Sequence, residues 1–264
     1  MNDTDPLLIR HQGDTATLVL NRPERRNAFT ETMWAALPEI LATLAERCRV
    51  LVVRGAGEHF ASGADISEFE AIYSTKARGE AYSASIAQAL DSLAAFPHPT
   101  LAAIRGACIG GGCGLALACD LRFADTSAKL AITPAKMGLL YPFADTKRLV
   151  DAVGASRAKD MLFSARIVEA NEALQIGLLD RVFEPAELDR EIDAYCNRLL
   201  DMSPVSATYT KKMISRVLEG QDYDSEETRA WFADAFAGAD FREGYRAFLD
   251  KRKPDFPARE ADDI

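Results

Sequence analysis

The sequence predicts an α/β fold in which strands alternate with helices and a helical C-terminal region follows. Short β-branched runs such as Thr15–Leu20 and Val50–Val53 are separated by longer segments with apolar residues on one face. Beyond about residue 143 the pattern changes to one helix after another. The chain has 264 residues, of which 48% are hydrophobic, and this is enough to bury a substantial core.

The first elements are separated by clear turn and breaker residues. A strand at Thr15–Leu20 ends at Asn21-Arg22-Pro23, and Thr30 is a suitable N-cap for a helix that runs to about Arg47. A short buried strand at Val50–Val53 is followed by a turn at Gly55-Ala56-Gly57. A long helix over Lys76–Ala95 is stopped by the prolines at 97 and 99.

The second half of the core has shorter elements. We predict strands at Thr100–Ile104, Leu121–Ala124 and Lys129–Ile132, and a short apolar helix at Gly112–Cys119. The helices after residue 143 are predicted at Phe143–Val153, Ser156–Phe163, Ala170–Ile176, Pro185–Leu200, Pro204–Leu218, Tyr223–Ala235 and Phe241–Lys251. This alternation, followed by a helical tail, predicts an α/β core with a helical appendage.

Composition excludes several classes of partner. The formal charge of −9 argues against a nucleic-acid duplex, whose phosphates need clustered Lys and Arg. The five cysteines form no CxxC pair and the three histidines are scattered, so we expect reduced thiols, no metal site and a cytoplasmic protein. The N-terminal segment lacks a basic region followed by an apolar run, and no apolar stretch reaches membrane-spanning length. We therefore expect neither a signal peptide nor a membrane partner.

Two glycine-rich segments follow strand-like runs and are the main chemical signals. They are residues 60–66 (FASGADI) and residues 106–114 (GACIGGGCG). Glycine lets a backbone N–H approach a ligand closely, and the second segment opens a helix whose first N–H groups lack internal partners. Such donors suit a developing oxyanion. On spacing alone, simple turns are the favoured explanation of both segments.

The whole-chain pattern resembles the enoyl-CoA hydratase/isomerase (crotonase) superfamily over nearly its full length. The resemblance is carried by NRPERRNAF at 21–29, by the two glycine-rich segments, by Cys119-Asp120, by TKRL at 146–149 and by ALQIGLL at 173–179. It implies a spiral of ββα turns, an acyl-CoA-binding core over residues 1–200 and a helical oligomerisation region over residues 201–264. It further implies a homotrimer or a dimer of trimers, with coenzyme A as part of the substrate and no separate cofactor.

The resemblance also implies roles for individual residues. Ala64 and Gly111 match the positions of the two oxyanion-hole N–H donors. Residues lining the adenine of the coenzyme correspond to Ala61, Asp65 and Ile66, while Arg25 and Ala28 fall on the loop beside the pantetheine and phosphates. Lys251 and Lys253 match a tail that could reach a neighbouring subunit's coenzyme, and a simple charged tail remains the alternative.

Both glutamates that hydratases of this family use to activate water are missing at the matching positions. Gly114 stands at one, and Pro134, or Ala135 after a shift of one residue, stands at the other. Neither glycine, proline nor alanine can transfer a proton, so hydration by paired carboxylates is not expected. Another side chain must handle the proton if the protein is an enzyme.

Tyr141 is the first candidate for that role. The segment from Thr133 to Tyr141 resembles the methylmalonyl-CoA decarboxylase branch, in which the matching tyrosine lies in the active site. That branch carries a histidine at the position of Ala64 and a carboxylate at that of Gly114, and this sequence has neither. A pocket-wall aromatic is the alternative for Tyr141. Asp145 and Glu68 are possible additional acids or bases, although capping and a solvated helix face explain them as well.

Three functions therefore remain open. The first is an acyl-CoA lyase or isomerase of the enoyl-CoA hydratase/isomerase family that acts through an enolate, and the second is a Tyr141-assisted decarboxylase of a malonyl-type thioester. The third is a catalytically inactive protein that binds CoA thioesters.

Overall fold

Two sheets organise the protein. In the computed structural model, which describes residues 4–256, a six-stranded sheet has the order β1-β2-β3-β4-β6-β9. Only the β1–β2 pair in it is antiparallel. Its strands are β1 (Leu7–Gln12), β2 (Thr15–Leu20), β3 (Val50–Gly55), β4 (Thr100–Ile104), β6 (Leu121–Asp125) and β9 (Arg181–Phe183). A smaller sheet, in the order β5-β7-β8, combines β5 (Ala107–Ile109), β7 (Lys129–Ala131) and β8 (Val168–Glu169).

Both faces of the large sheet are covered where β3 and β4 lie. Side chains of a strand alternate between its faces, so Leu51 and Val53 join the larger core while Val50 and Val52 join a second one. The second core is closed by α7 (Leu188–Leu200), which contacts β3 and β6. This double burial explains why the central strands read as uninterrupted apolar runs.

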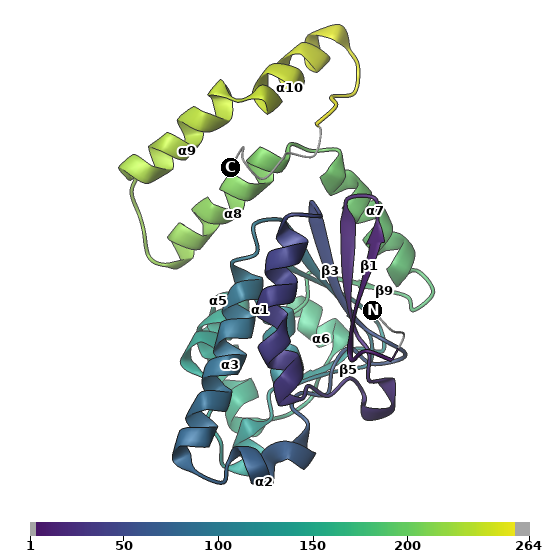
Figure 1. Ribbon diagram of the computed structural model, residues 1–264, viewed down its shortest axis with the longest axis vertical. Helices are drawn as coiled ribbons and strands as arrows, with labels where there is room; N and C mark the ends of the chain where they lie inside the picture. Colours follow the sequence, from purple (N-terminus) through teal and green to yellow (C-terminus); the bar gives the residue numbers. More distant parts are fainter. Residues whose placement is uncertain (1–3, 257–264) are drawn as a thin grey trace.

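The larger core lies under two long helices that pack on each other, α1 (Glu31–Ala45) and α3 (Lys76–Ala94) (Figure 1). Thr30 caps α1 as predicted, because its side chain accepts a hydrogen bond from Met33 N at 3.3 Å. The fully buried residues Trp34, Leu37 and Leu41 form the inner stripe of α1. A short α2 (Phe69–Ile72) precedes α3.

The helix that follows the second glycine-rich segment is α4 (Gly111–Ala118), and it contacts α3 and α5. The helix α5 (Phe143–Ser164) is broken at Gly154, where φ is 76° and ψ is 159°. This break lies between the two helices that the sequence predicts for the segment. A short α6 (Ala170–Gln175) leads to β9.

Three helices lie apart from the sheets at one end of the molecule: α8 (Pro204–Leu218), α9 (Glu226–Ala237) and α10 (Ala239–Asp250) (Figure 1). An ion pair of 2.9 Å between Lys211 and Asp120 holds α8 to the end of α4. Large apolar side chains on α9 and α10 are exposed, among them Phe232 and Phe248. Residues 1–3 and 257–264, at the ends of the two predicted regions, lie outside the described residues.

Short 3₁₀ turns complete the chain at η1 (Pro23–Arg25), η2 (Ile66–Glu68) and η3 (Pro134–Met137). Some predicted boundaries shift: α7 begins at Leu188 rather than 185, α9 at Glu226 rather than 223, and α10 at Ala239 rather than 241. Strands β1, β5, β8 and β9 were not predicted. None of the helices between residues 4 and 256 is long and apolar enough to cross a membrane.

Candidate active site

A short stretch of strand-like pairing brings the two glycine-rich segments together. Ala61 pairs in parallel with Cys108 of β5. Ala61 N donates to Ala107 O at 2.9 Å, and Ile109 N donates to Ala61 O at 2.9 Å. Ala64 lies three residues after Ala61, and Gly111 lies three residues after Cys108. The register therefore places the two predicted donors side by side.

The backbone amides of Ala64 and Gly111 are close neighbours. A Cβ built on Gly111 would lie 3.9 Å from Ala64 N, and one built on Gly63 would lie 3.5 Å from Gly111 N. Within residues 4–256 neither amide donates a hydrogen bond, whereas the adjacent Asp65 N and Gly110 N both do. Gly111 is also the first residue of α4, where N–H groups carry partial positive charge. The arrangement can bind an anionic oxygen between two main-chain donors.

Glycine is needed where these segments cross. A Cβ at Gly112 would lie 2.6 Å from Ala61 O and 2.8 Å from Ala61 Cβ, so a side chain there would push α4 off its neighbour. Gly63 has φ of 95°, a region that L-residues rarely adopt. The two segments approach closely only because these positions lack side chains.

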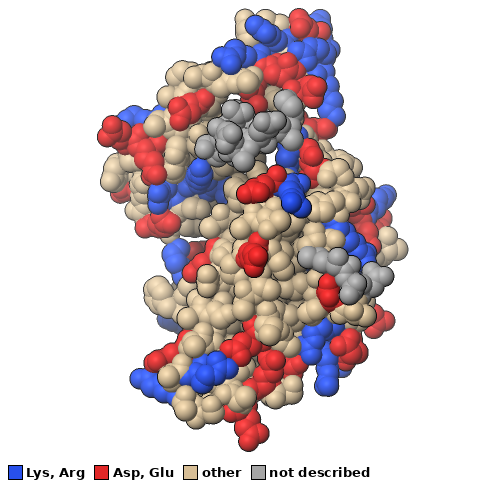
Figure 2. All heavy atoms as spheres, viewed as in Figure 1, with Lys and Arg blue, Asp and Glu red and all other residues tan. Residues whose placement is uncertain are grey.

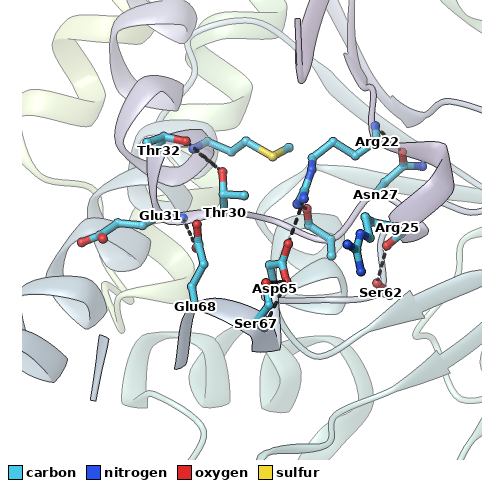
Figure 3. A network of polar contacts seen from close by, with 12 residues as sticks. Arg22, Arg25, Asn27, Thr30, Glu31, Thr32, Ser62, Asp65, Ser67 and Glu68 are labelled. Atoms are coloured by element: carbon cyan, nitrogen blue, oxygen red, sulfur yellow. Dashed lines mark hydrogen bonds and ion pairs between the residues drawn. The ribbon is translucent and has the colours of Figure 1, made fainter. Parts of the chain in front are cut away.

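The loop at 22–29 packs on the segment that carries the first donor, and Figure 3 shows its Arg22 and Arg25 in contact with Asp65 and Ser62 of that segment. Phe29 pairs with Ala64: Phe29 N donates to Gly63 O at 2.8 Å and Asp65 N donates to Phe29 O at 2.7 Å. Asn27 is fully buried, and its side-chain amide donates to Ala56 O and His59 O. This anchors the loop against the turn after β3, and Ala64 is thereby held between two backbone neighbours.

Two of the predicted carboxylates have structural partners (Figure 3). Asp65 accepts hydrogen bonds from Ser67 and pairs with Arg22 at 2.8 Å, and these contacts hold its pKa below the usual range. Glu68 accepts from Glu31 N at 2.8 Å, so it caps the first turn of α1. This contact ties one carboxylate oxygen of Glu68 to the start of α1.

The remaining residues matched to coenzyme binding lie around this loop. Ala61 is fully buried in the backbone pairing, and Ala28 is buried with its carbonyl accepting from Arg22 Nη1 at 2.6 Å. Arg25 is exposed on η1, and Ile66 is 64% exposed on η2. The exposed pair thus lies on the surface beside the first donor segment, while the two alanines support it from within.

Tyr141 and Asp145 converge on Gly114. A Cβ built on Gly114 would lie 3.1 Å from Tyr141 Oη and 4.0 Å from Asp145 Cγ. The Tyr141 hydroxyl is buried, with no hydrogen-bond partner in the described chain. Burial, together with the nearby Cys113, raises the pKa of Tyr141 well above its usual value, so the phenol keeps its proton. Burial likewise raises the pKa of Asp145, which pairs with Arg148 at 2.8 Å.

Sequence reasoning missed Trp34, which lies beside the second donor. Its Cζ2 would be 3.1 Å from a Cβ on Gly111, and its ring stacks on Phe29 with centroids 4.0 Å apart. The indole Nε1 and the Tyr82 hydroxyl are both buried, and each is the polar neighbour of the other. Trp34 sits on the inner stripe of α1, and nothing in its sequence context separates it from an ordinary core residue.

Other charged features lie away from the two amides. A groove of about 530 Å³ between α3, α5, α8 and α9 is lined by Asp91, Arg148 and Lys211 among others, and it contains none of the predicted site residues. Lys253 pairs with Asp201 of the same chain. In the described part of the chain, no three His, Cys, Asp or Glu side chains gather as potential metal ligands. On the face drawn in Figure 2, acidic and basic side chains are interspersed around a largely uncharged centre.

A family model, a curated relative and two solved structures all match this chain within one family. The sequence model described as "Enoyl-CoA hydratase/isomerase" matches residues 10–259. A short-chain-enoyl-CoA hydratase from Clostridium acetobutylicum is 30% identical over 94% of this chain and 95% of its own. Among solved structures, a protein from Hyphomonas neptunium assigned to the enoyl-CoA hydratase/isomerase family has a TM-score of 0.95 at 42% identity, covering 98% of this chain and 100% of that one. An enoyl-CoA hydratase/carnithine racemase from Magnetospirillum magneticum has a TM-score of 0.92 at 34% identity, covering 97% and 96%.

Proposed function

The chain belongs to the enoyl-CoA hydratase/isomerase family, and on this premise we propose that it binds an acyl-CoA thioester and stabilises the enolate formed from it. The observation that carries this proposal is the pair of neighbouring amides at Ala64 and Gly111, both without an acceptor in the described structure. Coenzyme A is then part of the substrate, and no separate cofactor takes part.

The physical basis is charge that develops on the thioester oxygen. Two fixed donors aimed at that oxygen favour the enolate over the neutral thioester, and they need no reorganisation during reaction. The partial positive charge at the start of α4 acts in the same direction at Gly111. Removing one donor of such a pair typically lowers kcat by about 10²–10³-fold.

Tyr141 supports decarboxylation as a second candidate function. Loss of carbon dioxide from a malonyl-type thioester leaves the enolate without a base, and a neutral phenol can then orient the carboxylate or supply a proton. The buried, unpaired hydroxyl of Tyr141 against Gly114 supports this role. A catalytically inactive thioester-binding protein is the remaining alternative, and turnover separates the three.

The same proposal extends to assembly and location. Exposed aromatic side chains on α9 and α10 support a role of the C-terminal helices in a homotrimer or a dimer of trimers. Lys251 and Lys253 then lie on the helical region that contacts a neighbouring subunit. The buried free thiols support a reducing, cytoplasmic setting.

Turnover of crotonyl-CoA, a 3-enoyl-CoA and methylmalonyl-CoA tests which reaction occurs. Consumption of an enoyl-CoA supports hydration or isomerisation, and loss of carbon dioxide supports the decarboxylase. Binding of all three without reaction leaves the inactive binding protein. A Tyr141→Phe variant that keeps full activity on methylmalonyl-CoA would end the decarboxylase hypothesis.

The donor pair is tested through Gly111. Gly111→Pro removes the N–H, while Gly111→Ala adds a comparable Cβ against Trp34 and keeps the N–H. The enolate absorbance of bound acetoacetyl-CoA should fall sharply in the proline variant and much less in the alanine variant. Equal enolate fractions in two folded variants would refute the assignment of Gly111 as a donor.

A further inference from the structure

The space beside Gly114 is filled from another helix. Gly114 lies three residues after Gly111 on α4, so the two positions share one face of the helix, about 5–6 Å apart. A side chain at 114 would point at the Tyr141 hydroxyl, 3.1 Å from its Cβ, and at Leu90 Cδ1, 3.4 Å away. A longer side chain at 114 could not coexist with these neighbours. Because Gly114 has no side chain, groups from α3, α5 and the segment before α5 lie against this position.

One of those groups is the carboxylate of Asp145. Its Cγ lies 4.0 Å from the Cβ position at 114, so an acid on α5 reaches the region that a side chain on α4 would otherwise fill. The side chain of Asp145 is 7% exposed. Its Oδ1 accepts from Arg148 Nη1 at 2.8 Å, whereas no residue within 4–256 donates a hydrogen bond to Oδ2. One carboxylate oxygen is therefore fixed and the other remains available.

Arg148 holds this carboxylate in place without enclosing it. The guanidinium pairs with Asp145 through Nη1 and with Asp91 of α3 through Nη2. The bridge fixes the orientation of Asp145 from the side of the groove under the C-terminal helices. The other two predicted acids differ, because Asp65 pairs with Arg22 and Glu68 caps α1, and neither lies against Gly114.

We propose that Asp145 is a catalytic base of this site and that its free carboxylate oxygen takes a proton from the carbon next to the thioester. The inference rests on the proposed enolate chemistry and adds the group that generates the enolate. The neutral phenol of Tyr141 lies against the same position, and its unpaired hydroxyl can donate to a substrate held beside this carboxylate. The base thus comes from the start of α5 and the anion site from the start of α4.

The step balances within the site. The bond between the α-carbon and hydrogen breaks, and the proton forms a bond to Oδ2 of Asp145. The electron pair moves into a carbon–carbon double bond as the thioester oxygen takes the negative charge, held by the amides of Ala64 and Gly111. Return of the proton to the α-carbon reverses the step, and return to the γ-carbon of an unsaturated acyl chain moves the double bond. No other reactant is needed.

Exchange of the α-protons of butyryl-CoA in D₂O, followed by mass spectrometry, isolates this step. The wild-type protein should incorporate deuterium, and Asp145→Asn should exchange at least about 100-fold more slowly with an unchanged Kd for butyryl-CoA. Asp151→Asn is the matched control, because Asp151 is another ion-paired acid of α5, but it pairs with Lys147 rather than Arg148 and does not lie against Gly114. Its exchange rate should stay within about twofold of the wild type.

A second variant separates chemistry from structure. In Asp145→Ala, added formate should restore part of the exchange, since a small carboxylate can enter the vacated space. Wild-type rates in a folded Asp145→Asn protein, or no recovery with formate in a folded Asp145→Ala protein, would overturn the assignment. If the wild type binds butyryl-CoA but exchanges no proton, Asp145 is not the base and the amide pair is unaffected. If no thioester binds at all, the proposed function itself fails.

Discussion

A methyl group at position 112 is predicted to separate the two amide donors. In Gly112→Ala the new Cβ would lie 2.6 Å from Ala61 O and 2.8 Å from Ala61 Cβ, the latter roughly 0.7 Å short of the roughly 3.5 Å at which non-bonded carbon atoms attract best. The Ala61 carbonyl cannot swing away, because it accepts from Ile109 N at 2.9 Å. The start of α4 must therefore move relative to the segment that carries Ala64. Overpacking of this kind costs about 1–3 kcal/mol of stability.

Misplacement of the donors should be more damaging than this loss of stability. A displacement approaching 1 Å can lower a rate by about 100-fold, so the enolate absorbance of bound acetoacetyl-CoA should fall steeply in Gly112→Ala. The Tm should fall by roughly 2–4 °C for each kcal/mol. Gly244→Ala, in α10, is the control: its Cβ would make only an ordinary contact of 3.7 Å with Phe256. A Gly112→Ala protein with wild-type Tm and enolate absorbance would refute the reasoning.

Three further predictions concern stability and thiol reactivity. Arg22→Met should cost about 1–3 kcal/mol in urea unfolding, because it removes hydrogen bonds to Ala28 O and Asp65, whereas Arg25→Met should cost less than about 0.5 kcal/mol. Because the pKa of Asp65 is lowered, its carboxylate stabilises the fold at pH values above the ordinary carboxyl pKa. This stabilisation is lost as the pH falls through the lowered pKa. Asp65→Asn should therefore make the free energy of unfolding depend less steeply on pH in the acid range. Burial raises the pKa of Cys48, Cys119 and Cys196 to about 12, so iodoacetamide at pH 8 should label these thiols only after unfolding; rapid labelling of the native protein would contradict this.

Local patterns predicted the elements whose determinants are local. The cap at Thr30, the buried stripe of α1 and the break at Gly154 all depend on residues within one or two helical turns. Strand β1 was missed because only its first residues are buried, and its pairing with β2 is what makes it a strand. The short strands β5 and β9 likewise depend on partners distant in sequence. Each of these two strands has three residues, which is too few to show the alternation of apolar and polar residues that identifies a strand.

The same distinction between local and tertiary determinants applies to the candidate site. Motif order located the segments that carry Ala64 and Gly111, and the structure places them together through the pairing of Ala61 with Cys108. Which carboxylate lies against Gly114 depends on tertiary packing, so the sequence could not separate Asp65 and Glu68 from Asp145. The place of Trp34 beside Gly111 depends on how α1 packs on α4, which no local pattern encodes.

The two groups proposed to bind the thioester oxygen belong to peptide bonds rather than to side chains. A substitution that keeps the backbone path at Ala64 alters its side chain but leaves the N–H in place. Side chains around the proposed anion site can therefore change while the backbone donors are retained. A scaffold of this kind is tolerant of drift in substrate preference. The same property makes it sensitive to strand register, since a shift of one residue between Ala61 and Cys108 would move Ala64 out of line with Gly111.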